Sequence, residues 1–251
     1  MIRVTIPFTC ILVLFFLTIF PYNAFAQQAD KGLWTSVEVK KKLNKRLSVS
    51  FEEEYRELNQ LGYTDQFKTS VGLSWKFKKY LKAEAGYTLT NKYDPTDLEQ
   101  WKTKHRLTAA LIYSFKVNRF DVSLQEKVQT NYRFGLLADE FKSNPAHYLR
   151  SKAKIAYNIK GYPINPYVFS EAFLSLNEPD GPSVPGSMQK FTALRLGSGV
   201  EYAFSKKLSA SLGYLFETGN EWDAFTVNGN RAGRFEDFSS HVITLGLSIT
   251  L

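Results

Sequence analysis

The chain has 251 residues, of which 44% are hydrophobic and 15% aromatic, and its net charge is +8 at pH 7. A mean hydropathy of −0.26 excludes a bundle of transmembrane helices, and the many aromatic residues argue against a disordered chain. A single cysteine excludes a disulfide framework and a cysteine-ligated zinc site.

The first segment, Met1–Ala26, has the features of a secretory signal peptide. An apolar stretch at 11–20 precedes the small-x-small cleavage motif Ala24-Phe25-Ala26. This stretch is too short for an anchor helix, which needs about 20 residues. We therefore predict that the segment is removed together with Cys10, and that residues 27–251 form an exported domain without disulfides.

The remainder of the chain alternates apolar and polar residues with a period of two, which is typical of β-strands. For example, Val71, Leu73 and Trp75 share one face, whereas Ser70, Gly72 and Ser74 share the other. The alternation predicts eleven strands, at 33–40, 46–57, 65–77, 81–90, 102–116, 120–133, 147–158, 164–176, 190–204, 208–217 and 239–251. No helical periodicity of useful length lies between them.

The predicted connections alternate between short and long. The short ones are 41–45, 78–80, 117–119, 159–163 and 205–207. The long, polar ones are 58–64, 91–101, 134–146, 177–189 and 218–238. This asymmetry is typical of outer-membrane barrels, which have short periplasmic turns and long outer loops. We therefore predict an all-β fold, a transmembrane antiparallel up-and-down β-barrel of about 10–12 strands.

Aromatic residues gather beside the short connections and predict an interfacial girdle. They are Trp75, Phe77, Tyr80, Phe115, Phe120, Tyr157, Tyr162, Tyr167, Tyr202 and Phe204. A second girdle at the other end is predicted from Tyr55, Phe67, Tyr87, Tyr132, Phe173, Phe191 and Tyr214.

An exported soluble sandwich or lipocalin-like barrel would also alternate, with its apolar face inward. Several strands here reach about twelve to fifteen residues, however, whereas soluble strands usually have about 5–6. Bacterial single-chain barrels have an even number of strands, and the pattern gives eleven. We expect ten or twelve, through loss of the strand at 33–40 or a split within 27–45.

The segments Trp34-Thr35-Ser36-Val37-Glu38 and Leu43–Arg56 resemble the opening of the domain of unknown function 2490 family. That family comprises small Gram-negative outer-membrane β-barrel proteins with no assigned activity. The resemblance implies the same fold and a location in the outer membrane. It implies no catalytic residues, because the family offers none.

If the apolar face contacts lipid, the polar face lines the lumen, where basic residues outnumber acidic ones about two to one. The lumen-lining candidates are Arg56, Lys68, Lys82, Arg106, Lys127, Arg133, Arg150, Arg195, Glu52, Glu54, Glu84 and Glu201. A water-filled pore lined in this way favours anionic small solutes. The alternative is that these charges pair across strands and close the interior, because about 8 strands already fill with side chains and porins need about 16.

Glu53, Glu126 and Glu171 fall on the predicted lipid face, where a carboxylate is unfavourable. A β-bulge that shifts the phase of the strand is the simpler explanation. The alternative is a functional acidic patch outside the barrel.

An outer-membrane lipid hydrolase would need a nucleophile and a base on the outer wall. Ser239, Ser240 and His241 are the candidates, and His105 and His147 also lie at outer strand ends. Adjacent residues on a strand face opposite sides, so Ser240 and His241 cannot simply bond, and Ser239 is at a loose spacing from His241. We therefore expect no enzyme activity, and no cofactor or metal.

Three functions are consistent with this sequence. The first is a narrow passive channel, the second a closed structural or surface-interaction barrel, and the third a lipid-modifying enzyme. The expected partners are outer-membrane lipid, the barrel-assembly machinery and small anionic solutes. Nucleic acid is not expected, because the lysine runs at 40–42 and 78–79 solvate turns or meet anionic headgroups.

Overall fold

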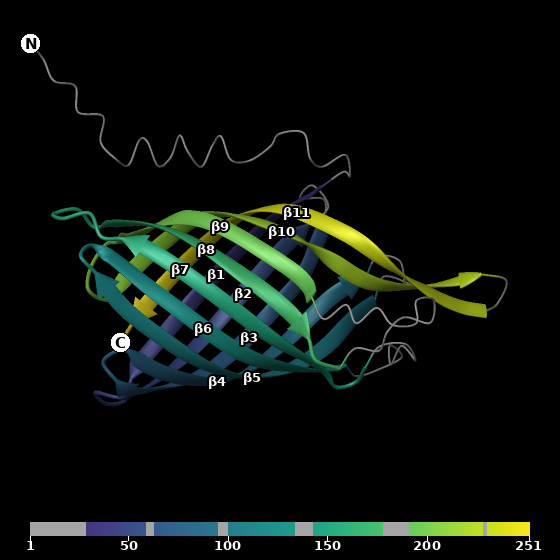
Figure 1. Ribbon diagram of the computed structural model, residues 1–251, viewed down its shortest axis with the longest axis horizontal. Helices are drawn as coiled ribbons and strands as arrows, with labels where there is room; N and C mark the ends of the chain where they lie inside the picture. The colour runs from purple at the N-terminus through teal and green to yellow at the C-terminus, as the bar shows by residue number, and fades with distance from the viewer. Residues whose placement is uncertain (1–28, 59–62, 95–99, 134–142, 178–190, 228–229) are drawn as a thin grey trace, which may run out of the picture.

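The computed structural model describes residues 29–58, 63–94, 100–133, 143–177, 191–227 and 230–251 (Figure 1). The predicted signal peptide, its cleavage motif and Cys10 lie outside these residues. Within them, no helix is long and apolar enough to cross a membrane.

Eleven strands lie in the described part of the chain and join into one closed barrel. They are β1 (Asp30–Lys42), β2 (Leu47–Leu58), β3 (Tyr63–Lys78), β4 (Leu81–Asp94), β5 (Gln100–Val117), β6 (Phe120–Arg133), β7 (Ala146–Tyr157), β8 (Ile164–Ser175), β9 (Phe191–Ala203), β10 (Leu208–Val227) and β11 (Asn230–Thr250). Each overlaps one predicted range, because the period-two alternation runs through every strand.

The barrel closes through a parallel pair of strands. Each strand is antiparallel to its neighbour in the chain, but β1 pairs with β11 in parallel, from Asp30 opposite Ser240 to Lys40 opposite Thr250. The predicted all-β up-and-down barrel of about 10–12 strands is confirmed, with antiparallel pairing everywhere except at this closure. Only the expectation of an even number, ten or twelve, is wrong. An odd number of alternating strands leaves the first and last running in the same direction, so only a parallel pair can close the wall. β1 is a full wall strand, bonded to β11 on one side and to β2 on the other.

The short connections are confirmed at one end of the barrel. The longest of them lies between Tyr157 and Ile164. One of the two shortest contains Asn118, whose φ of 54° is a left-handed conformation that asparagine tolerates. At the other end, the predicted long connection 218–238 is mostly strand. There β10 and β11 continue as a hairpin that projects beyond the barrel (Figure 1). The central parts of the other four long connections lie outside the described residues.

The side chains divide between an apolar exterior and a polar interior. Leu111 and Leu212 are 51% and 57% exposed, whereas Gln129 and Glu171 are each 5% exposed. A soluble β-sandwich has the opposite arrangement, with apolar residues inside. The predicted transmembrane barrel is thus confirmed, and the soluble alternative is wrong.

Pairs of aromatic rings surround the end with short connections. The ring centroids of Trp75 and Phe77 are 4.2 Å apart, and those of Tyr202 and Phe204 are 4.8 Å apart. Further pairs at this end are Tyr80–Tyr113, Tyr113–Phe115 and Phe120–Tyr157. Amphipathic rings at this level suit a membrane–water interface.

β8 turns its aromatic face into the barrel, opposite to the prediction from sequence. Its inward residues are Tyr167, Phe169, Glu171 and Phe173, and the ammonium of Lys154 lies 4.2 Å from the centre of the Tyr167 ring. The assignment of Tyr167 and Phe173 to girdles is therefore wrong, and so is that of Glu171 to the lipid face. The whole stretch 167–173 keeps one phase, so no bulge is needed to bring Glu171 inside.

Glycines on the neighbouring strands make room for these rings. Phe169 lies opposite Gly197 of β9, and Tyr167 lies opposite Gly199. A Cβ on Gly199 would be 2.7 Å from the Tyr167 hydroxyl oxygen, and one on Gly197 would overlap the Phe169 ring. The aromatic face of β8 is thus accommodated inside because β9 presents bare backbone to it.

Gly197→Ala is expected to lower the free energy of unfolding by about 1–3 kcal/mol, because the new methyl group overpacks against the Phe169 ring. Urea unfolding of the refolded barrel in micelles, followed by tryptophan fluorescence, measures this loss. In a Phe169→Ala background the same substitution should cost less than half as much. An equal cost in both backgrounds would contradict the proposed overlap.

Candidate functional site

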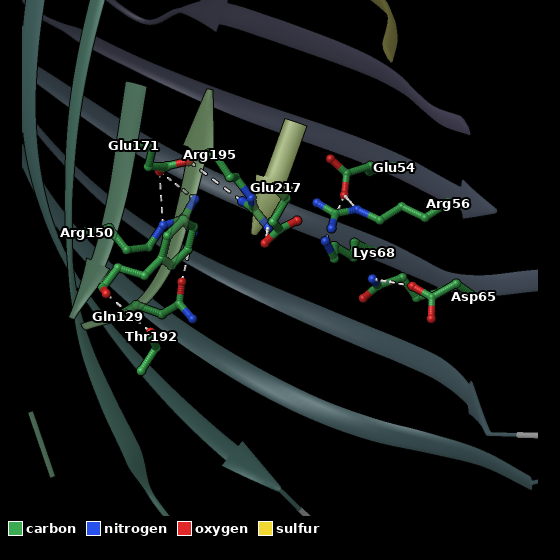
Figure 2. Close-up of polar contacts among 12 residues, drawn as sticks. Glu54, Arg56, Asp65, Lys68, Gln129, Arg150, Glu171, Thr192, Arg195 and Glu217 are labelled. Atoms are coloured by element: carbon green, nitrogen blue, oxygen red, sulfur yellow. Dashed lines mark hydrogen bonds and ion pairs between the residues drawn. The ribbon is translucent and has the colours of Figure 1, made fainter. Parts of the chain in front are cut away.

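A cluster of charged and aromatic side chains crosses the interior of the barrel in the half toward the long connections; we call it the central belt. Its members are Trp34 (β1), Glu54 and Arg56 (β2), Lys68 (β3), Arg150 (β7), Glu171 and Phe173 (β8), Arg195 (β9) and Glu217 (β10). Figure 2 shows the charged members pointing toward one another from opposite parts of the wall. Alternation along each strand places all of them on the inner face.

The first part of the belt centres on Glu54. Its carboxylate accepts a hydrogen bond from Arg56 Nε at 2.6 Å and one from Lys68 Nζ at 2.9 Å. Arg56 lies two residues further along β2, and Lys68 is directly opposite Glu54 on β3. One acid therefore holds two cations, both of them buried.

The second part centres on Glu171. Its carboxylate oxygens lie 2.7 Å from Arg150 Nη2 and 3.7 Å from Arg195 Nη1. Arg195 also pairs with Glu217, at 2.9 Å. The side chain of Glu171 is only 6% exposed, and those of Arg150 and Arg195 are 14% and 15% exposed. This is a nearly dry ion-pair network across four adjacent strands.

A stack of guanidinium groups and rings joins the two parts. The Arg56 guanidinium lies 3.4 Å from the Trp34 ring centre, and the Arg195 guanidinium is 5.2 Å from the same ring. On its other side Arg195 is 4.6 Å from the Phe173 ring, which Arg150 approaches to 4.5 Å. The stack thus runs from β2 to β7, strands on opposite sides of the closed barrel. Cation–π contacts of this kind are strongest where water is excluded.

Hydrogen bonds extend the belt to β6 and β5. Arg150 Nη1 donates to Gln129 Oε1 at 2.9 Å, and Gln129 Nε2 donates to Asn131 Oδ1 at 3.1 Å. The same Asn131 oxygen accepts a bond from Arg106 Nε at 3.0 Å. A continuous polar chain therefore follows the inner wall from Arg106 to Glu217.

The sequence model of a family described as protein of unknown function (DUF2490) matches residues 31–228. The chain belongs to this family. The predicted membership is thereby confirmed, over most of the chain.

Among solved structures, this DUF2490 barrel is similar to one titled "NanC porin structure in rhombohedral crystal form". The sequence identity is 13% and the TM-score 0.49, with 88% of this chain and 98% of the porin chain covered. A search of curated proteins finds no match.

The DUF2490 barrel brings five of the predicted lumen-lining residues into the central belt: Arg56, Lys68, Arg150, Arg195 and Glu54. The other predicted residues lie elsewhere along the wall.

Of these, Arg106 bonds to Asn131, and Lys82 pairs with Glu84 at 2.6 Å. Glu201 pairs with Lys154 at 2.5 Å. The remaining three are placed by the strand register. Glu52 lies opposite Glu38 and Ser70, and Lys127 lies opposite Arg150. Arg133 lies opposite Lys104, and its side chain is outside the described residues.

Sequence reasoning missed Trp34, Phe173 and Glu171 as members of the belt. A signal for Glu171 was present, because Gly197 and Gly199 follow the same face of β9 as Arg195 and leave space for large side chains on β8. By contrast, Glu53 and Glu126 do lie on the outer face, where they accept hydrogen bonds from Thr69 and Ser151.

The histidines lie beside hydroxyl groups of neighbouring strands. His241 Nδ1 is 2.5 Å from the Tyr214 hydroxyl oxygen, and His105 Nδ1 is 2.6 Å from that of Tyr87. His147 makes a similar contact with Thr130. In the described part of the chain, Ser239 Oγ has no hydrogen-bond partner, so it is not bonded to His241. The expectation of no enzyme activity stays a prediction, and the lipid hydrolase stays its alternative.

Proposed function

We propose that this protein is a narrow passive channel of the outer membrane with a net basic lumen that favours small anionic solutes. The observation that carries the proposal is the excess of positive charge in the central belt and in the hydrogen-bonded chain that extends it to Arg106. Five inward cations, Arg56, Lys68, Arg106, Arg150 and Arg195, gather around three acids, Glu54, Glu171 and Glu217. Fixed positive charge in a low-dielectric wall raises the local concentration of anions.

The outer membrane is the location that best fits the surface. The exterior is apolar around the barrel, and the chain begins with the features of a secretory signal peptide. A barrel of this kind satisfies all its backbone hydrogen bonds within the wall, as a membrane-spanning structure must. Its partners would be outer-membrane lipid and the machinery that inserts barrels.

The width of the channel would be set by the central belt. The stack that includes Trp34 and two guanidinium groups crosses the interior, so any passage would have to run beside it. A barrel of this strand number is smaller than the porins with 16–18 strands that hold open aqueous channels. We therefore expect a small conductance.

Single-molecule conductance of the refolded mature chain in a planar bilayer tests the proposal. Discrete small steps are expected, with a reversal potential in a KCl gradient that has the sign of chloride preference. Arg56→Gln is expected to reduce that preference, because it removes one positive charge at the constriction. Cation preference of the unmodified chain would contradict the proposed lumen charge.

The tight packing of the belt favours a second candidate, a closed barrel with a structural or surface-interaction role. Lys68 and Arg56 are 7% and 9% exposed, so little water reaches their charged groups. A silent bilayer, with insertion and folding verified by protease protection, would favour this candidate over the channel.

A further inference from the structure

The cations of the central belt each have a carboxylate partner. Among the described side chains, three inward-facing cations near the belt on adjacent strands have none. These are Arg106, Lys127 and Lys152, on the adjacent strands β5, β6 and β7. Among the side chains that the structure describes, no carboxylate oxygen lies within ion-pair distance of their charged nitrogens. The nearby inward-facing acids lie on other strands. Glu171 and Glu84 are already paired with other cations, and Glu52 on β2 interacts with Lys127 only from beyond ion-pair distance.

The strand register brings two of these cations together. Lys127 is opposite Arg150, and Lys152 is the next inward residue on β7, so Lys127 and Lys152 are diagonal neighbours. Such neighbours lie about 7–8 Å apart, which leaves room for one oxyanion between two ammonium groups. Arg106 is opposite Asn131, two inward positions along β6 from Lys127, and thus about 13 Å away.

Two of these side chains are held in place by uncharged groups. The Lys152 ammonium lies 4.2 Å from the Phe169 ring centre, and Arg106 Nε donates to Asn131 Oδ1 at 3.0 Å. Neither contact uses all the donors, because an ammonium has three N–H groups and a guanidinium five. The remaining N–H donors are available to a ligand. Because these contacts already restrict the two side chains, ligand binding would cost less side-chain entropy.

Like charges gathered without an ion-pair partner repel one another. The carboxylate closest in register, Glu171 opposite Lys152, is already shared between Arg150 and Arg195. An anion between Lys127 and Lys152 would remove the repulsion and form charge-assisted hydrogen bonds to both.

We propose that Lys127 and Lys152 form a binding site for a small multivalent oxyanion, a phosphate or polycarboxylate compound, and that Arg106 contacts the far end of longer ligands. The proposal deepens the proposed function and rests on it for the access of solutes to the lumen. It names the class of anion that such a channel would hold, as distinct from a monovalent ion such as chloride.

Calorimetric titration of the folded mature chain in detergent micelles with inorganic tripolyphosphate, and separately with citrate, tests the site. Saturable binding of at least one probe is expected, and the double variant Lys127→Gln/Lys152→Gln should weaken it at least about tenfold. Arg106→Gln should weaken tripolyphosphate binding more than citrate binding. Binding of one probe alone would assign the site to phosphate or to carboxylate chemistry.

The matched control is the double variant Lys82→Gln/Lys154→Gln, which removes the same charge from two lysines that have glutamate partners. Its binding constant should change less than about threefold. Equal weakening by both double variants would overturn the site, because the effect would then come from overall charge. Absence of saturable binding to the folded chain would also overturn it.

The titration and the bilayer recording separate the two proposals. A folded barrel that binds tripolyphosphate but conducts no ions would support the site and overturn the channel. A barrel that conducts anions but binds neither probe would support the channel and overturn the site.

Discussion

Replacing Glu171 with glutamine is expected to lower the free energy of unfolding by about 3–5 kcal/mol. Glu171 alone bridges Arg150 and Arg195, at 2.7 Å and 3.7 Å, in a nearly dry part of the interior. Glutamine has almost the same volume but no charge, so both guanidinium groups would lose a counter-ion and repel each other. Urea unfolding in micelles measures the loss.

Glu201→Gln is the matched control for this prediction. Glu201 also faces inward and pairs with a lysine, Lys154, but the two side chains are 42% and 32% exposed. Exposed pairs contribute about 0–1 kcal/mol, so the control should unfold almost like the unmodified chain. Similar losses in the two variants would mean that Glu171 is not a buried bridge of the belt.

Replacing Trp34 with alanine is expected to cost about 3–5 kcal/mol of unfolding free energy and to raise the conductance several-fold. The indole lies between the guanidinium groups of Arg56 and Arg195, so its removal takes away both cation–π contacts. It also removes the largest side chain of the stack that crosses the lumen. Planar-bilayer recording and urea unfolding measure the two effects.

Trp75→Ala serves as the control, because Trp75 is 49% exposed on the outer surface and contacts Phe77. It should leave the conductance unchanged. Trp34→Phe should restore much of the stability, since it keeps a ring in the stack. A Trp34→Ala channel with unchanged conductance would show that the constriction lies elsewhere.

The fold could be predicted from sequence because each strand alternates locally. Residues such as Leu111 and Leu212 identify the outer face of their strands without knowledge of any partner. β8 escaped this reasoning because its inward face carries Tyr167, Phe169 and Phe173. Apolar periodicity indicates that a strand face is packed, but it does not indicate whether that face contacts lipid or the interior. For β8 the glycines of β9 determine this, because they leave space for its rings inside the barrel.

The site could be predicted only in part, since the belt depends on contacts across the lumen. Arg56, Lys68 and Glu54 are neighbours in register and follow from the local pattern. The contact of Trp34 with Arg195 joins residues far apart in the chain. It depends on how β1 meets β11, and an alternating pattern does not contain that information.

The parallel closure of the wall has a consequence for sidedness. Because β1 and β11 run in the same direction, Asp30 lies at the end with the long connections, whereas Leu251 bonds to Lys40 at the end with the short turns. In a barrel with an even number of strands both positions would face the same compartment. In the proposed outer-membrane location, with the long connections outward, an epitope inserted at Asp30 would be reached by antibodies on intact cells, and one appended to Leu251 only after the envelope is opened.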